Sequence, residues 1–152
     1  MKLSTKGRYA MIALVDLALE GSERLVSLVE ISERQNISLP YLEQLFVKLR
    51  RSGIVSSVRG PSGGYRLSEN AESLRISEIL YAVDEGMDAM ARGAGATGTD
   101  PNTRANILTD KLWEQLSANV YVFLHQTRLS DIIFEQMMPC PAVPAFVELV
   151  DE

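Results

Sequence analysis

Two short helical patterns joined by a single turn, over residues 27–53, constrain the fold of this chain more than any other feature. Ser27 and Glu30 have the spacing of a capping box, in which a hydroxyl and a carboxylate each accept a hydrogen bond from a backbone N–H group at the start of a helix. This spacing predicts a helix over residues 28–35, and Asn36 suits the turn that follows it.

The second helical pattern is amphipathic. Ser38 can cap it, and Pro40 falls in its first turn, where the missing N–H group has no cost. The pattern ends at Gly53, and its apolar residues recur at the spacing of one buried face: Leu42, Leu45, Phe46 and Leu49. Because a longer helical pattern over residues 6–20 precedes the pair, the sequence predicts a helix-turn-helix.

A β-hairpin is predicted directly after the second helix. Strand-like runs over residues 54–58 and 65–67 flank a loop rich in Gly and Pro that begins with Arg59 and Gly60. A hairpin at this place is the wing of a winged helix-turn-helix. The predicted fold class is therefore mainly α with a small β wing, and the winged domain spans residues 1–85.

The rest of the chain predicts a dimerisation unit. Ser77 can cap one more helix of the winged domain, and residues 86–107 lack periodicity and predict a flexible loop. Residues 108–138 predict a long dimerisation helix with a following helix, and residues 139–152 form a tail. Along the long helix, apolar residues alternate in steps of three and four, as in a coiled coil: Trp113, Leu116, Val120 and Phe123. This seam predicts a homodimer, and packing against its own domain is the alternative.

Charge is distributed unevenly along the chain. The formal net charge is −5, but residues 1–70 hold ten Lys and Arg against seven Asp and Glu, whereas residues 71–152 hold five against thirteen. A basic N-terminal part joined to an acidic remainder favours a phosphate-bearing partner for the first part. Random scatter of charge is the alternative.

Several function classes lack support in the sequence. A single cysteine, Cys140, excludes an internal disulfide, and with His125 as the one histidine an ordinary zinc site within one chain is excluded as well. The chain has no catalytic triad spacing, phosphate-binding loop or His-Glu-x-x-His motif, so we expect no enzymatic activity. No apolar run approaches the roughly 20 residues that cross a bilayer, and no signal peptide is evident, so we expect a cytoplasmic protein without a membrane partner.

The face of the second helix opposite its apolar stripe can read double-stranded DNA. Gln44 can pair with adenine, Glu43 can accept a hydrogen bond from the amino group of cytosine, and Arg59 at the wing tip can enter a narrow A·T-rich minor groove. The candidate set includes further residues for phosphate and backbone contacts: Lys6, Arg8, Ser38, Pro40, Tyr41, Lys48, Arg51 and Gly60. A solvated helix face and an ordinary surface hairpin are the alternatives.

Four segments of the sequence resemble a known family. They are MKLSTKGRYA at residues 1–10, ISERQ at 31–35, ISLPYLEQLF at 37–46 and VRGPSGGY at 58–65. They closely resemble the iron–sulfur cluster regulators of the IscR type, a winged-helix family that also includes NsrR and RirA. The resemblance covers most of residues 1–85 and resumes at residues 108–113.

The resemblance implies a dimeric bacterial transcription factor that binds an imperfect palindromic operator at genes of iron–sulfur assembly or iron homeostasis. By matched position, it implies that four residues contact bases or a groove: Tyr41, Glu43, Gln44 and Arg59. Pro40 replaces the small polar residue that the family has at that position.

The chain departs from the family at the cluster-binding motif. The family carries three cysteines spaced C-x5-C-x5-C and a histidine shortly after them, whereas residues 86–110 contain neither residue type. In one hypothesis, Cys140, alone or with Cys140 of a second subunit, anchors an iron–sulfur cluster such as 2Fe–2S, and His125, a carboxylate or an added thiol completes the ligand set. In the other, the protein is a cluster-free regulator or a protein–protein adaptor that senses through Cys140 oxidation or not at all.

Overall fold

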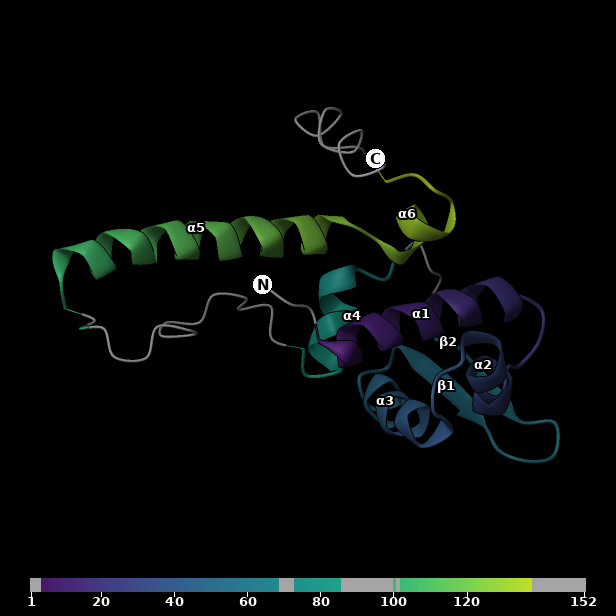
Figure 1. The fold of residues 1–152 in the computed structure, drawn as a ribbon. Coiled ribbons are helices and arrows are strands. Elements are labelled where there is room, and N and C mark those ends of the chain that lie inside the picture. Colours follow the sequence, from purple (N-terminus) through teal and green to yellow (C-terminus); the bar gives the residue numbers. More distant parts are fainter. Residues whose placement is uncertain (1–3, 69–72, 86–99, 101, 138–152) are drawn as a thin grey trace, which may run out of the picture.

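The computed structural model describes residues 4–68, 73–85, 100 and 102–137 of the chain. This part contains six helices and one two-stranded antiparallel sheet, in the order α1 (Thr5–Glu20), α2 (Leu28–Gln35), α3 (Leu39–Arg51), β1 (Val55–Val58), β2 (Gly64–Leu67), α4 (Ile76–Ala82), α5 (Arg104–Gln126) and α6 (Leu129–Ile133). Elements α1 to α4 and the sheet form a head, and the long helix α5 lies on one side of it (Figure 1). The predicted fold class, mainly α with a small β wing, is confirmed.

The helix-turn-helix forms as the local sequence predicts. The Ser27 hydroxyl accepts a hydrogen bond from the Glu30 N–H group at 3.2 Å, and the Glu30 carboxylate accepts one from the Ser27 N–H group at 2.8 Å. Helix α2 ends at Asn36, whose φ of 53° lies in the left-handed region that Asn tolerates better than most residues. Helix α3 begins three residues later, so the turn between the two helices is short.

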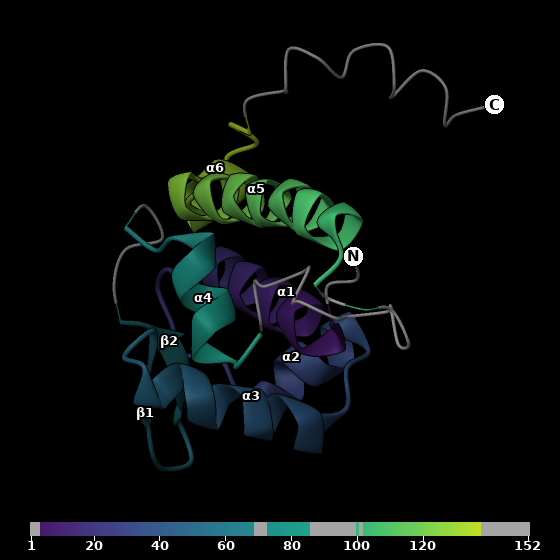
Figure 2. The same ribbon diagram turned by 90° about the vertical axis from the view of Figure 1, so that its left-hand side faces the viewer.

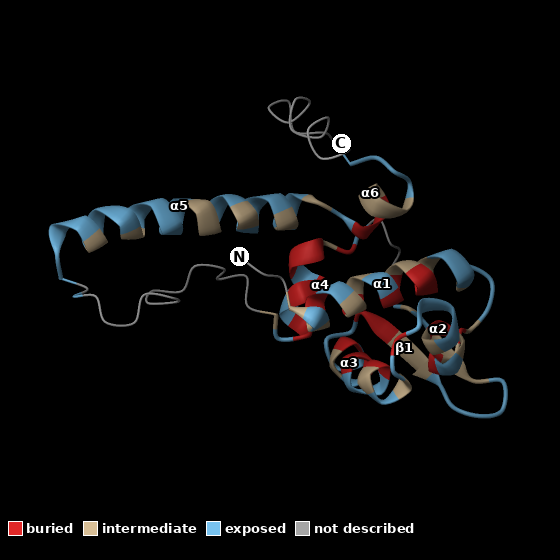
Figure 3. Ribbon diagram, viewed as in Figure 1, coloured by how far each residue is buried: buried red, intermediate tan, exposed pale blue. Residues whose placement is uncertain are grey.

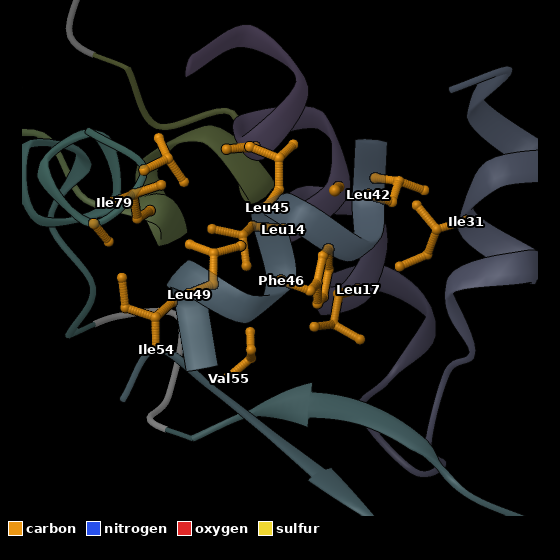
Figure 4. Packing of buried hydrophobic residues seen from close by; sticks show 14 of the residues in the cluster. Leu14, Leu17, Ile31, Leu42, Leu45, Phe46, Leu49, Ile54, Val55 and Ile79 are labelled. Carbon is orange, nitrogen blue, oxygen red and sulfur yellow. The ribbon is translucent and has the colours of Figure 1, made fainter. Parts of the chain in front are cut away.

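The core of the head lies between α1, α3, α4 and the sheet (Figure 4). All four apolar residues predicted to line the inner face of α3 are at most 2 % exposed. Burial of each such large apolar side chain contributes about 1.5–3 kcal/mol to the free energy of unfolding. Leu129 of α6 is fully buried in the same cluster, so the C-terminal helix is attached to the head.

The sheet is a hairpin whose antiparallel register pairs Val55 with Leu67 and Val58 with Gly64. Its inner face packs on α3, because Val55 is buried and the Tyr65 ring meets the Phe46 ring edge to face, with 4.9 Å between ring centroids. The hairpin therefore extends from the same core that positions α3.

Several predicted details differ from the structure. Ser38 occupies the N-cap position of α3, but its side chain makes no capping hydrogen bond. Ser77 lies inside α4, and the N-cap of that helix is Arg75, whose N–H group donates a hydrogen bond to the Glu78 carboxylate. Ser77 instead faces α5, where its hydroxyl meets His125, so a long-range contact determines its place.

Helices α5 and α6 begin or end at other residues than the sequence predicts. Helix α5 begins at Arg104, four residues before the predicted unit boundary at residue 108, because the Thr103 hydroxyl accepts a hydrogen bond from the Asn106 N–H group and caps it. Helix α6 ends at Ile133, short of the predicted residue 138.

Helix α5 has 23 residues and none of them is buried (Figure 3). It lies against the head mainly through α4, and in two perpendicular views α5 lies on the side opposite to α3 and the hairpin loop (Figures 1 and 2). No helix in the described part of the chain is long and apolar enough to cross a membrane.

Candidate nucleic-acid interface

Helix α3 presents a polar face to solvent. With 3.6 residues per turn, the side opposite the buried stripe carries Pro40, Gln44 and Arg51, and all three are exposed. Glu43 is also exposed and lies on one flank of this face, whereas Tyr41 lies on the other flank and is half-buried. The predicted base-reading residues Glu43 and Gln44 are therefore both accessible to a ligand that approaches α3.

The N-terminal end of α3 is packed against α1 through two aromatic rings. The rings of Tyr41 and Tyr9 meet edge to face, with 5.5 Å between their centroids and an interplanar angle of 85°. This arrangement is the favourable one for two aromatic rings. Tyr41 therefore has a structural contact in addition to the DNA contact predicted from the sequence.

The wing places Arg59 and Gly60 at an exposed tip. Gly60 has a φ of 122°, a conformation that side chains disfavour, and its carbonyl oxygen accepts a hydrogen bond from the Gly63 N–H group at 2.9 Å. A Cβ atom at Gly63 would lie 2.2 Å from the Val58 carbonyl oxygen. The tight loop thus requires glycine at these two positions, and it fixes the backbone that carries Arg59.

The base of the wing is held by the segment before α2. Val26 and Tyr65 exchange two backbone hydrogen bonds of 3.0 and 2.7 Å. A Cβ atom at Gly64 would lie 2.8 Å from the Val26 carbonyl oxygen, so the close approach of this segment requires glycine there. Because Tyr65 also packs on Phe46 of α3, the wing and α3 keep a fixed relation to each other.

An ion pair between a buried carboxylate and a partly exposed arginine holds α2 on α1 and so supports the same face. The Asp16 carboxylate, on α1, accepts hydrogen bonds from Arg34 at 2.7 and 3.0 Å and from Gln35 at 2.7 Å. Burial raises the pKa of Asp16, but the hydrogen bonds from Arg34 and Gln35 outweigh it and hold the pKa below its ordinary value. Sequence patterns gave no sign of this pair.

The basic residues of the predicted interface differ in their surroundings. Arg51 and Arg59 are exposed and make no ion pair with any described residue, and Arg8 is exposed as well. Lys48 forms an ion pair with Asp84 at 2.7 Å, and its hydrogen bond holds the pKa of that carboxyl below its usual range. Asp84 was missed by sequence reasoning, because no local pattern links it to α3.

His125 joins α5 to α4. Its Nδ1 atom lies 3.1 Å from the Ser77 hydroxyl, its ring stacks on the Tyr121 ring, and its carbonyl oxygen accepts a hydrogen bond from Arg75 at 2.6 Å. The described residues contain no group of three or more His, Cys, Asp or Glu side chains that could hold a metal ion. Cys140, the predicted cluster ligand, lies outside the described residues.

The four predicted seam residues lie on α5, which has no buried residue. Trp113 is 40 % exposed and Phe123 is 53 % exposed, and Leu116 and Val120 are half-buried. Other large apolar residues of α5 are exposed as well: Ile107, Leu108, Leu112, Tyr121 and Val122. Packing of the whole seam against its own domain, the alternative considered from the sequence, is not found among the described residues.

Comparison with known proteins finds close relatives over the whole chain. An HTH-type transcriptional regulator IscR from Cereibacter sphaeroides is 67 % identical over 154 aligned residues, which cover 100 % of this chain and 99 % of the relative. The regulator of the same name from Photorhabdus laumondii is 47 % identical, with 90 % of this chain and 81 % of the relative covered. These relatives are named as transcriptional regulators and not as enzymes.

Solved structures have the same fold. The IscR of T. potens is 33 % identical with a TM-score of 0.69, and the alignment covers 90 % of this chain and 89 % of the T. potens chain. CymR, the global cysteine regulator of B. subtilis, is 30 % identical with a TM-score of 0.72, and the alignment covers 89 % of this chain and 98 % of CymR. The model of the Rrf2 family, described as iron-dependent transcriptional regulators, matches residues 3–135. The resemblance to regulators of the IscR type is thereby confirmed, and this chain belongs to the Rrf2 family of transcriptional regulators.

Proposed function

We propose that this regulator binds double-stranded DNA as a homodimer, at an imperfect palindrome, through α3 and the β1–β2 wing. The observation that carries the proposal is the common face of these two elements. The exposed side of α3 and the wing tip with Arg59 lie on the side of the head opposite to α5, and the core fixes one relative to the other (Figures 1 and 2).

Each part of the face has a chemical role in this proposal. Gln44 and Glu43 offer the hydrogen-bonding groups that read adenine and cytosine in the major groove. Arg51 contributes positive charge for the phosphates, and Arg59 extends toward the minor groove beside the site, where a narrow A·T-rich groove has the strongest negative potential.

Helix α5 supplies the dimer in this proposal. Contiguous apolar surface on one long helix is a common sign of a partner surface. The steps of three and four between the seam residues suit the same helix of a second copy. Two copies related by a two-fold axis would present two α3 helices, as a palindromic operator requires.

The iron dependence is proposed to act through Cys140. The described residues alone do not form a cluster site, because they bring together no set of donor groups. A cluster needs about four ligands, so one thiolate from each of two subunits needs further donors from His125, carboxylates or an added thiol. The proposed target genes, those of iron–sulfur assembly and iron homeostasis, follow from the resemblance to regulators of the IscR type, and the description of the matching family model, iron-dependent transcriptional regulator, supports them.

Titration of the protein with salt tests the DNA-binding function. Fluorescence anisotropy with a labelled duplex of random sequence and with operator fragments selected from a random pool measures binding between about 50 and 200 mM salt. We expect the affinity to fall steeply as salt rises, because Lys and Arg displace counterions from the phosphates. A protein that binds no duplex at any of these concentrations would contradict the proposal and favour a protein–protein adaptor.

Anaerobic purification tests the role of Cys140. Iron and sulfide analysis with a visible absorption spectrum shows whether a cluster is present, and Cys140→Ala is expected to abolish both the absorbance and the bound sulfide. The variant is expected to remain folded, because the head has a buried core of its own among the described residues. Colourless parent protein, or a full complement of iron and sulfide in the variant, would contradict the ligand assignment.

A further inference from the structure

Asp84 lies where α1, α3 and the end of α4 meet. Its carboxylate accepts a hydrogen bond from Lys48 Nζ at 2.7 Å, and its backbone carbonyl oxygen accepts one from Lys6 Nζ at 3.3 Å. Both lysines belong to the proposed DNA-contacting set. One acidic residue thus engages two of the basic side chains that would otherwise be available to phosphates.

The backbone holds Asp84 firmly in this place. Its φ of 55° is left-handed, and its N–H group donates to the Tyr81 carbonyl oxygen at 3.1 Å. The carboxylate of the next residue, Glu85, accepts hydrogen bonds from the N–H groups of Ser4 at 3.0 Å and Gly7 at 3.3 Å, and so satisfies free donors at the start of α1. The negative charge of Asp84 is therefore a fixed feature beside α3.

The ion pair is exposed enough for DNA to compete with it. The Asp84 side chain is 72 % exposed and the Lys48 side chain is 36 % exposed. Exposed ion pairs are weak, so a phosphate group can draw the Lys48 ammonium away from Asp84. The phosphate then approaches an uncompensated carboxylate, which repels it. Any contact between Lys48 and the DNA backbone is weakened by this repulsion.

We propose that the Asp84 carboxylate limits the affinity of this regulator for DNA of any sequence by holding Lys48 away from the phosphate backbone. The inference rests on the proposed DNA-binding function. Phosphate contacts carry no base information, so Asp84 lowers sequence-independent binding, while Gln44, one turn earlier on α3, remains available for base contacts. Because non-specific sites far outnumber operators in a genome, this restraint increases the share of protein on its operators.

The substitution Asp84→Asn tests the proposal. Asn removes the charge, keeps the size and tolerates the left-handed backbone. Fluorescence anisotropy with a labelled duplex of unrelated sequence measures the affinity of the full chain over a series of salt concentrations. We expect the variant to bind about two- to fivefold more tightly at low salt. The slope of log affinity against log salt should steepen by about one, as for one additional phosphate contact.

Two further variants separate this effect from a general change in charge. Glu135→Gln is a matched control, because Glu135 is also a carboxylate with a φ of 55°, but it follows α6 on the far side of the head from α3 (Figure 1). It is expected to leave both the affinity and the slope close to those of the parent. In a Lys48→Ala background, Asp84→Asn is expected to have little effect.

Three results would overturn the proposal. The first is parent-like affinity and slope for Asp84→Asn while the parent binds DNA, which contradicts this inference alone. The second is an equal gain for Glu135→Gln, and the third is an undiminished gain in the Lys48→Ala background. The side-chain oxygen of Asn can still accept a hydrogen bond from Lys48. Asp84→Gly removes this oxygen as well and suits the left-handed backbone, so it is tested beside Asp84→Asn. A parent protein that binds no duplex contradicts both this inference and the proposed function.

Discussion

Arg59 is the first residue after β1, and its place at the wing tip follows from the glycines around it. Gly60 supplies a positive φ, and Gly63 leaves room for the Val58 carbonyl oxygen, so the loop is short and its first residue is presented to solvent. An arginine there carries a charge without an ion-pair partner among the described residues.

We expect Arg59→Ala to weaken operator binding and to relax the preference for A·T-rich flanks, because an arginine in the minor groove responds to groove width and negative potential. Competition between duplexes that differ only in their flanks measures both effects. Arg66→Ala, which removes an exposed arginine from β2 away from the tip, is the control. Unchanged affinity and flank preference in Arg59→Ala would show that the wing tip does not contact DNA.

Glu43 presents a negative charge on a face that is proposed to approach phosphates. Such a charge is unfavourable unless a cytosine amino group satisfies it. We therefore expect Glu43→Ala to broaden the set of bound sequences, with incorrect sites gaining about 1–3 kcal/mol relative to the correct one. Selection from a random pool measures this change. An equal loss of affinity at every site would show that Glu43 has a structural role.

At the scale of residues, the exposure of a side chain on α3 could be predicted from the sequence, but the side chain with which it pairs could not. Helical spacing alone places Gln44 opposite the buried stripe of α3 and Glu43 on the flank of that face, and the structure has both exposed. The same spacing gives Lys48 as a phosphate contact, although it pairs with Asp84 from a later element. Contacts between residues distant in sequence depend on the packing of whole elements, which local periodicity does not contain.

At the scale of elements, α2 depends on the two side chains of its capping box. The Glu30 side chain is 37 % exposed, so burial has only a small effect on the pKa of its carboxyl group. The hydrogen bond from the Ser27 N–H group and the Arg24 guanidinium at 2.7 Å hold the pKa of Glu30 well below its ordinary value, at about 2. The carboxylate therefore stabilises the fold in its ionised form.

The contribution of Glu30 to stability is complete above its ordinary pKa of 4.5 and is lost as the pH falls from there toward about 2. We expect urea unfolding of Glu30→Gln to depend less on pH in this range than unfolding of the parent. The expected difference is about 0.5–1 kcal/mol, because water screens an exposed pair. Glu33→Gln on the same helix is the control. Identical pH dependence of Glu30→Gln and the parent would contradict this role.

Element limits could be predicted where the signal is local. The Ser27–Glu30 capping box, the left-handed Asn36 and the turn glycine Gly53 all act within a few residues. Helix α2 begins just after Ser27 and ends before Asn36, and α3 ends just before Gly53. Ser77 is the contrary case. Its residue type favours an N-cap, but the N-cap of α4 lies two residues earlier, because the backbone at Arg75 pairs with the segment after α5 and Ser77 meets His125. A tertiary contact overrides the local preference there.

At the scale of the whole molecule, the hydrogen bonds between the head and the region of α5 lie at the C-terminal end of the helix, among the residues that the structure describes. The Ile76 N–H group donates to the Thr127 carbonyl oxygen, and the Leu129 N–H group donates to the Leu74 carbonyl oxygen, at 3.0 and 2.8 Å. Together with the contact of His125 with Ser77, these bonds lie at the C-terminal end of the helix. The N-terminal half of α5 extends past the head with its apolar residues exposed (Figure 3). Because these contacts hold the head to α5, the orientation of α5 in a dimer would set the orientation of each head.

The paired substitution Trp113→Ala with Leu116→Ala tests the dimer. Neither residue belongs to the buried core of the head, so we expect the head to keep its free energy of unfolding while sedimentation shows a monomer. Because two linked heads bind two half-sites with a high effective concentration, affinity for a complete operator should fall by about a hundredfold or more, and affinity for a single half-site should stay the same. Gln115→Ala, an exposed position of α5 away from the seam, should leave both unchanged. If the double variant sediments as the parent does, α5 pairs through other residues or not at all, and a palindromic operator loses its structural basis.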